Sequence, residues 1–161
     1  MSLLIRKLDP VADLDDVQTL YAQAADYWLL ADRRAPDRQK AMDFFTDTPP
    51  GGDPAASHRL GLFVEGRLAG VTELAFGFPE PGDPYLGLMI LAPEARSQGF
   101  GRVLLAEVER RARPAPHLYL GVLDANPRGR AFWESNGFID TGIGRHDAET
   151  SHSLRRMIKR F

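Results

Sequence analysis

The pattern of apolar and polar residues along the 161-residue chain predicts strands and helices in alternation. Apolar runs of strand length predict a first strand at 3–8, a hairpin within 58–78, single strands at 85–91 and 117–123, and a final hairpin built from 138–145 and 153–160. Apolar residues at helical spacing predict four helices: at 11–28, at 36–45, from the glycines near 100 to Pro114, and at 127–136.

The order of these elements predicts a single domain, residues 1–161, of the α/β (α+β) class. A strand, a helix and a second strand follow one another between residues 85 and 123, and this order implies a parallel pair joined by a right-handed crossover. The remaining strands come in hairpins, so we expect a mixed, mostly antiparallel sheet with helices on both faces.

A turn with two glycines, Gln98-Gly99-Phe100-Gly101, leads into the third helix. The first N–H groups of a helix lack internal partners and attract anions, and glycine allows a close approach of the backbone. With Arg96 and Arg102 beside it, the turn fits a phosphate; a simple bend with solvated arginines is the alternative. In the helix that follows, an apolar stripe is predicted to be buried, and Glu107–Arg111 and Glu109–Arg113 are predicted ion pairs. The stripe consists of Leu104, Leu105, Val108 and Ala112.

Two other nucleotide-binding folds do not match this turn. A dinucleotide-binding fold needs GxGxxG, but Leu104 stands at the third glycine position and a hairpin precedes the turn. The phosphate loop GxxxxGK[ST] is absent as well. A phosphate-binding module of another fold remains a remote alternative.

Composition narrows the classes of function. Twenty Lys and Arg residues against 22 Asp and Glu residues give a net charge of −2, which argues against a general nucleic-acid binder. The chain has no cysteine, and its four histidines lack the spacing of a zinc site, so we expect no metal. No long apolar run and no signal-peptide start are present, so we expect no membrane partner and a cytoplasmic protein.

Two segments, LAPEARSQGFGRVLLAEVERRAR and NPRGRAFWESNGF, resemble the signature regions of the GNAT superfamily of N-acetyltransferases. The resemblance extends over the element order of the whole chain. It implies acetyl-CoA as cofactor, with the pyrophosphate on the glycine turn, the pantetheine arm along 89–91, and a splay between the two parallel strands. The implied cofactor contacts are Met89, Ile90, Leu91, Arg96, Ser97, Gln98, Gly99, Phe100, Gly101, Arg102, Asn126 and Trp133.

The chain departs from the family where an acid and a base are often found. Trp133 stands where many members have a tyrosine, and Gly121 stands where some have a glutamate. An indole is not an acid at neutral pH. Candidate bases are Glu73 and Asp124, whose alternative roles are a strand-face charge and a turn residue. The backbone N–H of Leu91 is a candidate donor to the developing oxyanion.

The resemblance therefore implies transfer of acetyl to a primary amine by direct attack in a ternary complex. The alternative is a non-catalytic acyl-CoA-binding or regulatory module on the same fold. The acceptor is a small-molecule or peptide amine, and a homodimer is left open. Aromatic and acidic residues from the early helices and from 76–85 favour, weakly, a cationic or aromatic-bearing amine. They are Tyr21, Tyr27, Trp28, Phe44, Phe45, Glu80 and Asp83. Core packing is the alternative role of these aromatic residues, and also of Tyr85 and Tyr119, which are candidate acids.

Overall fold

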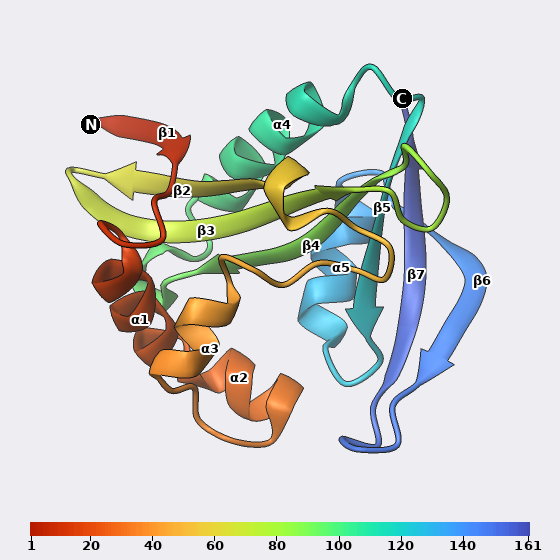
Figure 1. Ribbon diagram of the computed structural model, residues 1–161, viewed down its shortest axis with the longest axis horizontal. Coiled ribbons are helices and arrows are strands. Elements are labelled where there is room, and N and C mark those ends of the chain that lie inside the picture. The colour runs from red at the N-terminus through yellow and green to blue at the C-terminus, as the bar shows by residue number, and fades with distance from the viewer.

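The computed structural model describes residues 1–161 and contains one seven-stranded sheet of order β1-β2-β3-β4-β5-β7-β6 (Figure 1). The strands are β1 (Leu3–Lys7), β2 (His58–Val64), β3 (Arg67–Phe76), β4 (Pro84–Leu91), β5 (His117–Leu123), β6 (Ile139–His146) and β7 (Ser153–Arg160). The helices are α1 (Leu14–Gln23), α2 (Ala25–Asp32), α3 (Arg38–Asp43), α4 (Phe100–Ala112) and α5 (Pro127–Ser135). Short 3₁₀ turns cover Pro54–Ala56 and Pro93–Ala95.

The predicted fold class is confirmed. All strand pairs are antiparallel except β4 with β5, which is the predicted parallel pair around α4. In Figure 1, α4 lies on one side of the sheet and α1, α2 and α3 gather on the other. The final hairpin is inserted with β7, rather than β6, next to β5.

The parallel pair is short, and this creates the main opening in the molecule. Only Tyr85 with Tyr119 and Leu86 with Leu120 are paired between β4 and β5. Beyond these residues the two strands diverge, so the backbone of Gly87–Leu91 has no strand partner on the β5 side. Unpaired strand backbone can bind an extended ligand.

The core forms where the amphipathic pattern predicts it. Leu104, Leu105, Val108 and Ala112 are all buried on the inner face of α4, so the predicted stripe is confirmed. The Glu107–Arg111 ion pair is present at 2.9 Å.

The predicted Glu109–Arg113 pair is wrong, because both side chains find tertiary partners. Glu109 binds Lys159 at 2.9 Å, and the Arg113 guanidinium stacks on the Phe161 ring. Contacts with another element decide the partners of these two side chains, because an i,i+4 ion pair along one helix is only weakly stabilising.

The helical prediction at 11–28 was wrong in treating two helices as one. The chain breaks at Ala24, whose ψ of 30° ends α1 while its N–H bonds to Leu20 O. Neither glycine nor proline marks this break, so the sequence gives no signal of it. The helix predicted at 36–45 is α3, and it begins later than predicted, because Asp37 is its N-cap and the Asp37 carboxylate accepts from the N–H of Lys40.

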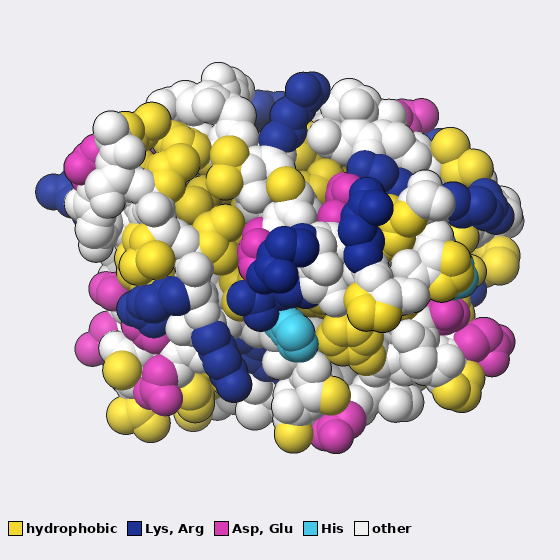
Figure 2. All heavy atoms as spheres, turned by 90° about the horizontal axis from the view of Figure 1, so that it is seen from above, with side chains coloured by type: hydrophobic (Ala, Val, Ile, Leu, Met, Phe, Trp, Pro, Cys, Tyr) yellow, Lys and Arg dark blue, Asp and Glu magenta, His cyan; other side chains and the backbone are white.

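Two properties of the structure concern membranes and nucleic acids as partners. No helix is both long enough and apolar enough to cross a membrane. Figure 2 shows Lys and Arg side chains in separate groups on one face, with acidic and apolar side chains between them. That face therefore carries no single continuous basic surface.

Candidate active site

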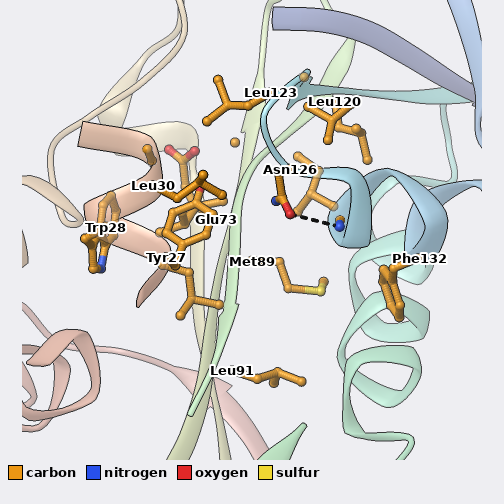
Figure 3. Close-up of a pocket in the computed structure, with 18 of the residues that line it drawn as sticks. Tyr27, Trp28, Leu30, Glu73, Met89, Leu91, Leu120, Leu123, Asn126 and Phe132 are labelled. Atoms are coloured by element: carbon orange, nitrogen blue, oxygen red, sulfur yellow. Dashed lines mark hydrogen bonds between the residues drawn. The ribbon is translucent and has the colours of Figure 1, made fainter. Parts of the chain in front are cut away.

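The divergence of β4 and β5 opens a cavity of about 670 Å³. One end is lined by the splayed strands and α5, with Met89, Leu91, Asn126 and Phe132 among its residues; we call it the strand end. The other end is lined by α1, α2 and α3 together with Glu73, and we call it the helix end. Figure 3 shows Glu73 with Tyr27 and Leu30 on one side of the cavity and Asn126 and Phe132 on the other.

Glu73 is the principal ionisable group of the cavity. It is only 5% exposed, and burial raises the pKa of its carboxyl to about 7. Arg59 is its direct cross-strand partner and donates to Glu73 Oε2 at 3.1 Å, which opposes the rise. Burial outweighs this attraction, so Glu73 exchanges a proton near neutral pH, as a general base must.

Arg59 explains how the carboxylate is held. Its guanidinium also donates to the carbonyl oxygens of Phe44 and Asp47, the latter at 3.0 Å. These carbonyls follow the C-terminal end of α3. Arg59 therefore ties the wall of the helix end to Glu73, and all of its hydrogen bonds stay inside the protein.

Gly87 leaves room for the Glu73 side chain. The pairing of β3 with β4 shifts between Glu73 and Leu74, so that Gly87 is skipped opposite them as a β-bulge. A Cβ atom at position 87 would lie 2.0 Å from Glu73 Oε1. Only glycine at this position permits the observed carboxylate position.

The glycine turn has two glycines with different roles. Gly99 is the N-cap of α4 with φ of 88°, a left-handed conformation that favours glycine, and nothing in the protein lies within 4 Å of an added Cβ. Gly101 is buried, and a Cβ there would lie 3.1 Å from Phe132 Cζ. Gly99 thus shapes an open turn with free helix N–H groups, whereas Gly101 permits close packing of α4 against α5.

Of the turn residues, only Ser97 and Gly101 line the cavity; Gln98, Gly99, Phe100 and Arg102 lie outside it. Gln98 donates to the carbonyl of Glu94, Phe100 is buried in the core, and Arg102 is exposed and forms no ion pair.

The Arg96 guanidinium is already engaged in the protein. It forms an ion pair with Asp26 of α2, at 2.7 Å and 3.1 Å, and donates to Leu91 O at 3.3 Å. This contact lowers the pKa of Asp26. Arg96 therefore joins α2 to the turn after β4, and Asp26 neutralises much of the charge that it would offer to a phosphate.

The residues expected along the pantetheine arm do line the cavity. Met89, Ile90 and Leu91 come from β4. Asn126 is the N-cap of α5, and its Oδ1 accepts from the N–H of Gly129 at 3.0 Å, which leaves its Nδ2 free to donate. Trp133 lies edge-on to Phe132 and Phe138, with ring centroids at 4.9 Å and 5.6 Å.

The other candidate acids and bases lie apart from Glu73. Asp124 does not line this cavity; it is exposed and borders a second cavity of about 430 Å³. Asp83 forms a pair with His117 at 2.9 Å, outside the cavity. Tyr85 does line the cavity, and burial raises the pKa of its hydroxyl, so it is a weaker acid than an exposed tyrosine. Tyr119 and Glu80 do not line it.

The structure adds residues that the sequence pattern did not single out: Arg59, Asp47, Gly87 and Arg128. A signal for Arg59 exists, because it is the second residue of the largely apolar run HRLGLFV, where a buried cation requires a partner. The positions of Asp47 and Arg128 depend on tertiary packing and carry no such signal. No group of three or more His, Cys, Asp or Glu side chains lies close enough together to hold a metal ion.

Comparisons with known proteins identify the family of this chain. The family model described as "Acetyltransferase (GNAT) family" matches residues 18–138. No curated protein matches the chain.

Solved structures of acetyltransferases are similar over nearly the whole chain. An acetyltransferase from Thermus thermophilus shares 19% identity, with a TM-score of 0.79, over 100% of this chain and 98% of its own. The PaiA N-acetyltransferase from Thermoplasma acidophilum, solved with coenzyme A, shares 22% over the full length of both chains, at a TM-score of 0.70. A ribosomal-protein-alanine N-acetyltransferase from Brucella melitensis shares 24% at 0.73, over 98% of this chain and 99% of its own. At such identities the likeness shows the fold.

Proposed function

Because the chain belongs to the acetyltransferase (GNAT) family, which uses acetyl-CoA, we propose that it transfers acetyl from acetyl-CoA to a primary amine. The observation that carries this proposal is the single cavity in which the splayed edge of β4 meets a buried carboxylate, Glu73, with a pKa of about 7. A binding module needs the first feature but has no use for the second.

The residues present fit acetyl-CoA. The open turn at Gly99 offers unpaired helix N–H groups for a diphosphate, and Arg128 lines the strand end of the cavity without an ion pair of its own. The free edge of β4 at 89–91 and the Nδ2 of Asn126 fit the amide groups of a pantetheine arm. When bound, acetyl-CoA supplies a thioester whose carbonyl carbon accepts the amine.

Glu73 is the proposed general base. An amine enters as an ammonium and must lose a proton before it can attack. A carboxylate with a pKa of about 7 holds such a proton at neutral pH, and Arg59 keeps it at a fixed position. Asp124 borders a different cavity and is given no role.

The other groups at the reaction centre are backbone and apolar side chains. The N–H of Leu91, on the splayed strand, is the proposed donor to the carbonyl oxygen that gains negative charge. Trp133 forms a wall of the cavity and has no acidic proton. Because a thiol has a pKa of about 8.5, its thiolate is a good leaving group, and protonation by an acid would accelerate its departure little.

The experiment is calorimetric titration with CoA, followed by a CoA-release assay with acetyl-CoA and a panel of primary amines. Binding together with amine-dependent CoA release supports the proposal. Binding without release from any amine favours the alternative, a non-catalytic acyl-CoA-binding module, which the missing tyrosine and glutamate at positions 133 and 121 motivate. Absence of CoA binding contradicts both.

A further inference from the structure

We infer that the acceptor is a primary amine whose α-carbon carries no carboxylate, held at the helix end of the cavity. This inference rests on the proposed function and narrows its substrate class. Its basis is the balance of unused hydrogen-bonding and charged groups at that end, where Tyr21, Tyr27, Trp28, Phe44, Asp47, Arg59 and Glu73 line the wall.

No cation at the helix end is free to bind a carboxylate. Arg59 is 5% exposed, and its guanidinium donates to Glu73 and to two backbone carbonyls. Lys40 forms an ion pair with Asp32 at 2.9 Å and stacks its ammonium on the Trp28 ring, 4.7 Å from the centroid. A substrate carboxylate at this end would therefore lack a counter-ion and would lie beside Glu73.

Acceptors of hydrogen bonds, by contrast, are free. The Asp47 side chain makes no hydrogen bond or ion pair within the protein, although its backbone oxygen binds Arg59. Tyr21 is 1% exposed, lines the cavity, and its hydroxyl has no partner in the protein. Together with Glu73, these groups accept up to the three N–H bonds that a primary ammonium offers.

The rest of the wall suits an apolar or aromatic body. Tyr27, Trp28 and Phe44 supply ring surface, and Leu30 and Ala31 extend it. Trp28 Nε1 is a buried donor without a partner. A single neutral donor cannot compensate the charge of a buried carboxylate.

The test uses matched pairs that differ only in the carboxylate: tyramine against tyrosine, and phenethylamine against phenylalanine, with tyrosine methyl ester as the neutralised control. We expect kcat/KM for each amine to exceed that of its amino acid by about tenfold or more, as for an uncompensated charge, and the ester to approach the amine. Equal or faster turnover of the amino acids overturns the inference while leaving the proposed function intact.

A variant pair identifies the group responsible. Asp47→Asn is expected to lower kcat/KM for tyramine and to reduce its advantage over tyrosine. Asp43→Asn removes the same charge from a nearby residue that does not line the cavity, and it should leave both values unchanged. An equal effect of the two substitutions contradicts a local role for Asp47. Failure of every amine in an enzyme that binds CoA overturns the proposed function, and this inference with it.

Discussion

Replacing Glu73 with glutamine tests the proposed base with little change in shape. The glutamine keeps an oxygen in reach of Arg59, which lies 3.1 Å from Glu73 Oε2, but it cannot take a proton from the acceptor. Loss of a general base costs about 10²–10⁴ in rate. We therefore expect kcat of Glu73→Gln to fall by about that factor while CoA affinity is retained.

The pH dependence gives a second, independent reading. With a pKa of about 7, Glu73 is about one-tenth ionised at about pH 6, so wild-type kcat/KM should fall about tenfold per pH unit below neutrality. The Glu73→Gln variant should lack this fall in kcat/KM at acid pH. The assay is CoA release followed with a thiol reagent at saturating acetyl-CoA between about pH 5.5 and about pH 8.5.

The pH dependence of the free energy of unfolding reports the pKa of Glu73 in the absence of substrate. The folded-state pKa of Glu73 lies above its ordinary value, so the native protein binds a proton more tightly than the unfolded chain. Wild-type stability should therefore fall relative to that of Glu73→Gln as pH rises from about 4.5 to about 7. Turnover by Glu73→Gln within about threefold of wild type at about pH 8, with an unchanged acid limb, would refute the role of this carboxylate.

Further substitutions at Gly87, Gly99 and Trp133 follow from the geometry, with Gly82 as a control position. Gly87→Ala places a Cβ 2.0 Å from Glu73 Oε1 and should lower kcat by displacing the carboxylate, while adding nothing to the loss in Glu73→Gln; additive losses in the double variant would contradict this. Gly99→Ala and Gly82→Ala carry similar backbone strain, with φ of 88° and 84°, so each should cost about 1–2 kcal/mol of stability in a denaturant titration. Only Gly99→Ala should weaken CoA binding, and equal loss in both would remove the turn from the site. Trp133→Phe should keep most turnover and lose some stability from its two edge-on ring contacts, and a gain of about a hundredfold in Trp133→Tyr would show that acid assistance was missing.

The parts of the fold that follow from local pattern were predictable. Strand-length apolar runs marked the strands, and the buried stripe of α4 followed from helical spacing. A helix end that no glycine or proline marks was not predictable, as at Ala24, where α1 ends. Side-chain partners chosen by tertiary contact were not predictable either, as with Lys159, which displaces Arg113 from Glu109.

The candidate site divides in the same way. The family motifs pointed to the strand end of the cavity, because the proposed cofactor contacts lie near the turn at Gly99 and the helix cap at Asn126. The helix end is assembled from segments distant in sequence, so spacing alone could not bring Asp47 beside Glu73. The motifs also could not distinguish the role of Gly99, which shapes the turn, from that of Gly101, whose missing side chain lets the Phe132 ring pack closely. The charge offered by Arg96 is likewise altered only by its tertiary partner, Asp26.

The most direct test of acetyl transfer to an amine follows the acetyl group itself. The protein is incubated with tyramine and acetyl-CoA that carries an isotope-labelled acetyl group, and both products are quantified by mass spectrometry. The account predicts one labelled N-acetyl group on tyramine for each CoA released, with Glu73→Gln slower by about 10²–10⁴. CoA binding with no labelled product above the protein-free rate, for tyramine and for every other amine supplied, would contradict it.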